Sequence, residues 1–185
     1  GLVGDDEHNT SGDFSTYDTA ITLGGPILRD RLWFFGSYQQ KHREDDVTDV
    51  GTGAILRSVT NDADYGFGKL TWQITDNDRL TATFFNDPTE ISGSNSSATL
   101  NNRDVAREQG GDNYKIDYSH IFGDLIVNAY MFKHEGLLTT VAADQSTRDN
   151  VTYRSSAGST LAQRSLGGSG SNLETHRDRD EWGLN

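Results

Sequence analysis

Histidine and carboxylate side chains offer this chain its most obvious chemistry, and their spacing favours no metal site. None of the five histidines in the 185 residues shows the close spacing of zinc ligands. Acidic runs at residues 5–7 and 44–46 supply the oxygens that Ca²⁺ prefers, but such runs are also common in solvated loops. We expect no metal and no cofactor, with calcium binding in these loops as an open alternative. The histidines are His8, His42, His120, His134 and His176.

No pattern in the sequence favours an enzyme. The chain has no cysteine, which excludes thiol catalysis and zinc-thiolate sites. No Ser-His-Asp arrangement and no pair of carboxylates stands out. The run GGSGSN at residues 167–172 lacks the Lys and Ser/Thr of a phosphate-binding loop and is typical of a flexible linker. We therefore expect no catalytic residues.

Four charged residues have a spacing that suits a wet surface. Their stretches are apolar at every second position, so their side chains would point away from the apolar side. In a barrel they would face the lumen, where they would contact a plug or line a substrate path. The simpler alternative is a lumen wall that is polar without a specific role. These candidate lumen-facing residues are Lys69, Arg79, Lys115 and Asp117.

Composition limits the elements that can position these residues. Only 33% of the residues are hydrophobic and the mean hydropathy is −0.68, which argues against a large conventional core. No apolar run approaches the roughly 18–20 residues of a spanning helix, so a membrane crossing would need strands of about 9–11 residues. The net charge of −12 argues against nucleic acid as a partner. Because no basic, apolar secretory segment stands at the N-terminus, we expect that it was removed or that the chain is an internal piece.

Strand-like stretches joined alternately by tight turns and long polar connections set the expected fold. The long connections lie near residues 43–62, 87–111 and 135–179, and they are the candidate ligand-binding loops. This asymmetry predicts an all-β fold: an antiparallel up-and-down transmembrane β-barrel segment with short turns on one side and long loops on the other. Open edges in lipid would leave backbone groups unpaired, so we expect a part of a larger barrel. The expected strands are residues 17–27, 32–42, 63–74, 79–86, 112–121, 125–134 and 180–185.

The alternation also predicts how the strands pair. In the first hairpin, a turn at residues 29–30 sets Ile27 opposite Leu32 and Ile21 opposite Tyr38. In the second hairpin we expect a three-residue loop at 76–78, and in the third a turn through 121–124. The expected apolar pairs are Ile74 with Leu80, Trp72 with Ala82 and Leu70 with Phe84 in the second hairpin, and Tyr118 with Val127, Ile116 with Ala129 and Tyr114 with Met131 in the third.

Aromatic residues gather toward the ends of these strands, as the interfacial girdles of a membrane barrel require. The alternative is that they form the core of a soluble protein. The residues concerned are Trp33, Phe34, Tyr38, Trp72, Phe84, Tyr114 and Tyr118.

Three stretches resemble a known family. LGGPILRDRLWFFGSYQ (residues 23–39) resembles the opening barrel hairpin of TonB-dependent outer-membrane receptors of the Oar-like type. LTWQITDNDRLTATF, from Leu70, and GGDNYKIDYSHIF, from Gly110, resemble the following hairpins. The resemblance covers about residues 17–134, and it implies a barrel of about 22 strands with an N-terminal plug in the bacterial outer membrane.

The resemblance implies ligand uptake or export, driven by the TonB complex, as the function of the whole protein. The implied partners are outer-membrane lipid, a plug domain, the TonB complex and a ligand whose identity the sequence does not give. No plug domain stands within residues 1–185, and the matched stretches are scaffold from which no ligand-binding residue carries over. The alternatives are a self-contained small outer-membrane barrel with an adhesive or structural role, and a soluble extracellular β-domain that binds carbohydrate or protein.

Overall fold

The computed structural model describes residues 13–49, 52–93, 105–142, 151–153, 164–166 and 172–185, and the structural statements below concern these residues. They form strands and turns throughout. Among them there is no helix long and apolar enough to cross a membrane.

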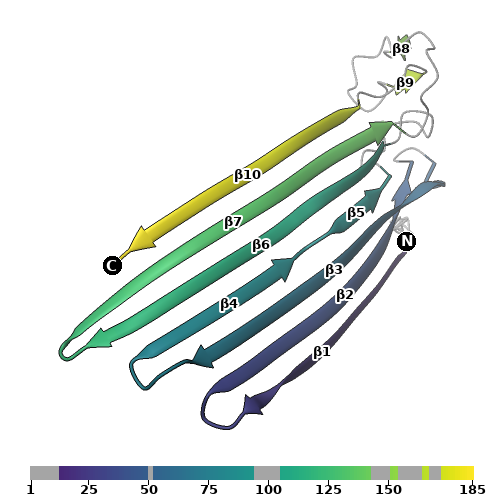
Figure 1. Ribbon diagram of the computed structural model, residues 1–185. Helices are drawn as coiled ribbons and strands as arrows, with labels where there is room; N and C mark the ends of the chain where they lie inside the picture. The colour runs from purple at the N-terminus through teal and green to yellow at the C-terminus, as the bar shows by residue number, and fades with distance from the viewer. Residues whose placement is uncertain (1–12, 50–51, 94–104, 143–150, 154–163, 167–171) are drawn as a thin grey trace, which may run out of the picture.

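The strands form one large antiparallel sheet and one small ladder (Figure 1). Neighbours in the eight-stranded sheet follow chain order: β1, β2, β3, β4, β6, β7 and β10, with β5 continuing the line of β4 between β3 and β6. β8 and β9 pair only with each other. The strands are β1 (Phe14–Leu28), β2 (Leu32–Thr48), β3 (Ile55–Gln73), β4 (Asp78–Asn86), β5 (Thr89–Ser92), β6 (Val105–Phe122), β7 (Leu125–Ala142), β8 (Val151–Tyr153), β9 (Arg164–Leu166) and β10 (Leu173–Leu184).

The large sheet is a single layer with almost no interior (Figure 1). In the described part of the chain, the only buried hydrophobic side chains are Val59, Ala63 and Ala142, and no large side chain is fully buried. Backbone hydrogen bonds between the strands therefore hold the sheet together. The side chains on both faces are exposed and can contact lipid, solvent or other protein segments.

The predicted antiparallel up-and-down fold is confirmed. Short turns at residues 29–31, 74–77 and 123–124 lie at one end of the sheet, and the strand ends that the longer connections join lie at the other end (Figure 1). The alternation of short and long connections thus places every turn of the three hairpins on one side.

The predicted register of the first hairpin is confirmed along most of its length. Ile21 pairs with Tyr38, as expected, and Gly24 pairs with Phe35, whose ring covers the bare glycine backbone. Near the turn the prediction was wrong, because Leu28 rather than Ile27 pairs with Leu32. An irregularity after Pro26 takes up the extra residue, since Pro has no N–H for the ladder.

The other two hairpins are each displaced by two residues from the predicted register. The second loop has the expected three residues but lies at 75–77, so Trp72 pairs with Leu80. In the third hairpin Phe122 pairs with Leu125 across a two-residue turn, whose Gly123 has the positive φ of 59° that such turns favour. Because a shift of two residues preserves the alternation, every side chain stays on its predicted face.

The strands are longer than predicted, and the long connections are correspondingly shorter. Of the expected loops, 43–62 falls largely in β2 and β3, 87–111 partly in β5 and β6, and 135–179 partly in β7 and β10. The last strand runs from Leu173 to Leu184, so the expected strand 180–185 covers only its end. Most of these extensions carry charged or other polar residues on both faces, so they lack the apolar alternation that identified the other halves of the strands.

Candidate functional site

A band of exposed apolar side chains crosses one face of the sheet, which we call the Leu70 face. Directly paired residues share a face, and one paired row runs through all seven strand positions without a polar side chain. Trp182 in this row is 80% exposed and Met131 is 68% exposed. No described element covers the band. The row consists of Gly25, Phe34, Leu70, Ala82, Ile116, Met131 and Trp182.

The next row toward the turns is also apolar apart from one tyrosine hydroxyl. It consists of Leu28, Leu32, Trp72, Leu80, Tyr118, Ala129 and Leu184. Seven strands spaced by about 4.8 Å make these two rows about 30 Å wide. The band is therefore a continuous surface and not a set of scattered residues.

Tyrosine hydroxyls that donate hydrogen bonds to carboxylates lie at both edges of this band. On the side of the long connections, Tyr38 donates a hydrogen bond to Asp64, and Tyr114 donates one of 3.1 Å to Asp112. On the turn side, Tyr118 donates one of 2.5 Å to Asp78. Rings on the apolar side with hydroxyls toward charged groups are the arrangement that a membrane–water boundary favours.

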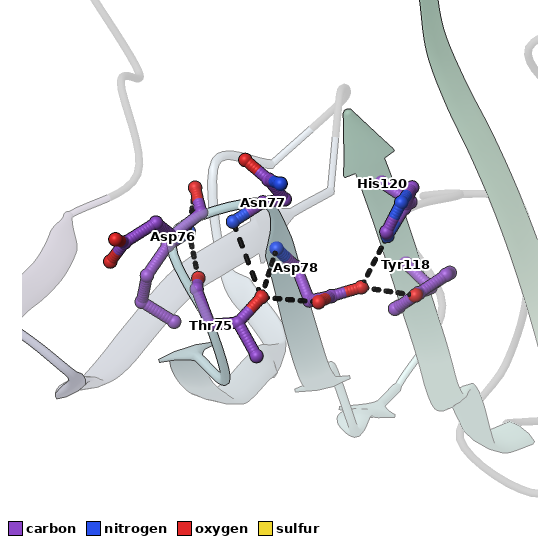
Figure 2. Close-up of polar contacts among 7 residues, drawn as sticks. Thr75, Asp76, Asn77, Asp78, Tyr118 and His120 are labelled. Carbon is purple, nitrogen blue, oxygen red and sulfur yellow. Dashed lines mark hydrogen bonds and ion pairs between the residues drawn. The ribbon is translucent and has the colours of Figure 1, made fainter. Parts of the chain in front are cut away.

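Asp78 organises the turn edge of the band (Figure 2). Its carboxylate accepts a hydrogen bond from the Thr75 hydroxyl, which in turn accepts hydrogen bonds from the backbone N–H groups of Asn77 and Asp78. Nδ1 of His120 lies 2.5 Å from the same carboxylate. The hydrogen bonds from Thr75, Tyr118 and His120 hold the pKa of the Asp78 carboxyl well below its usual range. The cluster fixes the second turn against β6.

The four candidate lumen-facing residues share the opposite face, which we call the Lys69 face. Lys69 and Lys115 both pair with Thr83, which lies between them, and Arg79 lies four residues along β4 toward the turn. Together with Asp117 they line a concavity of about 580 Å³. The strand register therefore places all four residues on one face, as the sequence predicts. That this face lines a lumen stays a prediction.

Charge is sorted between the two faces, a feature that the sequence interpretation missed. On the Leu70 face of the described strands, Lys133 is the only Lys or Arg. The acidic residues there are Glu44, Asp46, Asp62, Asp64, Asp78, Glu90, Glu108, Asp112, Glu135, Glu174, Asp178 and Asp180.

The Lys69 face is mainly basic although the whole chain is acidic. Its basic residues are Lys41, Arg43, Arg57, Lys69, Arg79, Arg107, Lys115, Arg177 and Arg179, and its acidic strand residues are Asp18, Asp45, Asp117 and Glu181. The sequence carries this signal as the alternating signs of residues 177–180 (RDRD), most of which fall in the expected loop 135–179.

The other candidate groups do not come together. The acidic run at 5–7, His8, and residues 167–171 of the glycine-rich run lie outside the described residues, as do parts of the three candidate ligand-binding loops. Of the described histidines, His42 contacts Asp62 and His134 contacts Asn113. Among the described residues there is no group of three or more possible metal-ligating His, Cys, Asp or Glu side chains.

The chain matches no family model, no curated protein and no solved structure. The class proposed below therefore rests on the sheet and on the resemblance of three hairpin stretches.

Proposed function

We propose that this chain is part of the barrel wall of a TonB-dependent receptor in the bacterial outer membrane, and that the whole protein takes up or exports a ligand. The apolar band on the Leu70 face carries the proposal. Soluble monomers rarely leave a continuous apolar patch larger than about 300–600 Å² uncovered. Hydrocarbon is the natural cover for a band that is continuously apolar on one face. The other face at the same level is mixed, with lysine and threonine side chains beside the rings of Trp33, Phe35 and Phe132.

The polar extensions of the strands fit the same arrangement. Beyond Tyr38 and Tyr114, the strands continue with charged residues on both faces, whereas the turns lie just past the other edge of the band. A spanning strand needs only about 9–11 residues, and β3 extends from Ile55 to Gln73. In the proposed orientation, the remainder of each long strand projects out of the membrane on the side of the long connections.

The edges of the sheet support a larger assembly. β1 and β10 each pair on one side only within the described part of the chain. An unpaired strand edge in hydrocarbon costs several kcal/mol for each unsatisfied backbone group. In the proposed barrel, other strands of the parent protein pair with both edges.

The TonB-dependent class is proposed from the resemblance of three hairpin stretches. Residues 23–39 resemble the opening barrel hairpin of that family, and the stretches that begin at Leu70 and Gly110 resemble the hairpins that follow it. The plug, the contact with the TonB complex and the transport step belong to the parent protein. In this proposal the chain forms a part of the barrel wall, contacts the lipid and supplies long connections between strands. It carries out no catalytic step.

Arginine substitutions in adjacent positions test the proposal. In the full-length protein, Ala82→Arg places a charge in the apolar row of the Leu70 face, and Thr83→Arg places the same charge on the other face of the same strand. A charge facing lipid costs about 2–4 kcal/mol at the midplane, so Ala82→Arg should abolish outer-membrane assembly and Thr83→Arg should allow it. Assembly is read from the membrane fraction and from heat-dependent gel migration. Equal assembly of both variants would contradict the proposal, and detergent-independent folding of both would support a soluble extracellular β-domain.

A further inference from the structure

Three cations form a triangle on the Lys69 face. Lys69 on β3 and Lys115 on β6 are separated by one strand, so their backbones lie about 10 Å apart. Arg79 is four residues from Thr83, which lies between them, so it stands about 13 Å along β4. Side chains of this length reach several ångströms from the sheet, and the three can therefore converge on one solute.

Two of these cations have no counter-charge in the described part of the chain. Lys69 and Arg79 make no hydrogen bond or ion pair there, whereas Lys115 lies 2.7 Å from Asp117 and 5.5 Å from the centre of the Tyr130 ring. The concavity thus contains three positive groups and one negative group. A like-charge cluster of this kind gains from a bound anion, because the anion relieves repulsion among the cations.

The surface between the cations is lined by neutral hydrogen-bonding groups. Thr71, Thr81, Ser119 and Asn128 line the same concavity, whose volume of about 580 Å³ lies within the usual range of small-molecule sites. Hydroxyl and amide groups can bind the neutral parts of a polar solute. The arrangement is therefore suited to a small, hydrophilic, anionic molecule.

The basic character continues along the Lys69 face toward the long connections. Arg177 and Arg107 lie on this face in the polar extensions of β10 and β6, and the acidic residues of those extensions lie mainly on the other face. Sorting by face leaves a net positive surface in a chain whose net charge is −12. Such a surface attracts anions toward the concavity and repels cations.

We infer that the concavity formed by Lys69, Arg79 and Lys115 binds a small solute that carries two or more carboxylate or phosphate groups. The inference rests on the proposed function, because it takes the Lys69 face as the wall of a lumen, and it names the class of ligand. An acidic polypeptide segment would satisfy the same charges. The limited volume of the concavity and its hydroxyl lining favour a small solute over an extended chain.

Calorimetric titration of the full-length, detergent-solubilised protein tests this inference with citrate and pyrophosphate as probes. Lys69→Gln and Arg79→Gln each remove one cation from the concavity, and Lys133→Gln removes one from the Leu70 face as a matched control. Each concavity variant should weaken binding about ten-fold or more and should reduce its dependence on salt. Lys133→Gln should leave the affinity unchanged, and Lys69→Arg should retain most of it.

Three results would overturn the inference: no binding of either probe, unchanged binding in Lys69→Gln and Arg79→Gln, or an equal loss in Lys133→Gln. If an acidic segment of the parent protein occupies the face, neither probe binds and the inference fails. Titration in detergent is independent of insertion into a membrane. Binding without insertion would therefore contradict the proposed function alone, and insertion without binding would contradict this inference alone.

Discussion

The backbone of Gly110 in β6 lies directly against the carbonyl oxygen of Asp87, with no room for a Cβ atom. Gly110 has a φ of +134°, and the neighbouring Gly111 N–H donates a 2.9 Å hydrogen bond to the Asp87 side chain. This contact occurs where β4 gives way to β5, at a proline that cannot donate to the ladder. The glycine pair thus allows β6 to pair with both β4 and β5 across the break at residues 87–88.

Replacing Gly110 should therefore destabilise the sheet at this point. Gly110→Ala combines a disfavoured positive φ with overlap against rigid backbone, and we expect a loss of about 1–3 kcal/mol or more. Gly68→Ala is the control, because a Cβ at Gly68 meets nothing within 4 Å. Urea unfolding in detergent should show a lower midpoint for Gly110→Ala alone. Equal midpoints for the two variants would show that the close approach is unimportant.

The first turn should require a residue at position 30 that tolerates a positive φ. Asp30 has a φ of 60°, a left-handed conformation that Asp tolerates and β-branched residues do not. Asp30→Val should lower stability by about 1–2 kcal/mol, while Asp30→Gly should preserve it. Asp124→Val in the third turn is the control, since Gly123 supplies the positive φ there. The prediction fails if both valine variants unfold at the same urea concentration as the unchanged protein.

The Asp78 cluster should make stability depend on acidity. The folded pKa of Asp78 is lowered by its hydrogen bonds, whereas an unfolded Asp titrates near 3.9. The cluster therefore adds stability above about pH 4, and this contribution is lost as the pH falls through the folded pKa. Asp78→Asn should be less stable than the unchanged protein at pH 7, and the difference should shrink below about pH 4.

The measurement is the temperature at which heat-dependent gel migration changes, followed from pH 7 to pH 2. Asp76→Asn is the matched control, because the Asp76 side chain makes no hydrogen bond or ion pair in the described part of the chain. A difference between Asp78→Asn and the unchanged protein that stays constant over this range would contradict the assignment.

The faces of the sheet could be predicted from sequence because alternation is a local property. Leu70 and Lys69 are neighbours, and strand geometry alone sends them to opposite sides. Register depends on where a turn begins, which is a weaker signal. TDND permitted more than one three-residue loop, and the strand-forming Ile121 and Phe122 were included in a turn that needs only Gly123 and Asp124.

The strand ends and the charge sorting could not be obtained by searching for apolar alternation. Residues 177–180 alternate between basic and acidic positions, so both faces are polar there and hydropathy shows no period. The pairing of Asp178 with Glu135 and of Arg177 with Gly136 becomes visible only when the strands are aligned. The basic face thus comes from long-range register, whereas each residue's side of the strand comes from local sequence.

The orientation of the Leu70 face toward hydrocarbon is tested most directly by labelling single positions along β4. The chain has no native cysteine, so one nitroxide label at a time can be introduced at residues 80–84 of the membrane-inserted protein. We predict that labels at 80, 82 and 84 collide mainly with membrane-soluble oxygen, and that labels at 81 and 83 collide mainly with a water-soluble nickel reagent. The proposed membrane wall would be contradicted if the collision rates did not alternate between neighbouring positions. It would also be contradicted if labels at 82 and 84 collided mainly with the nickel reagent.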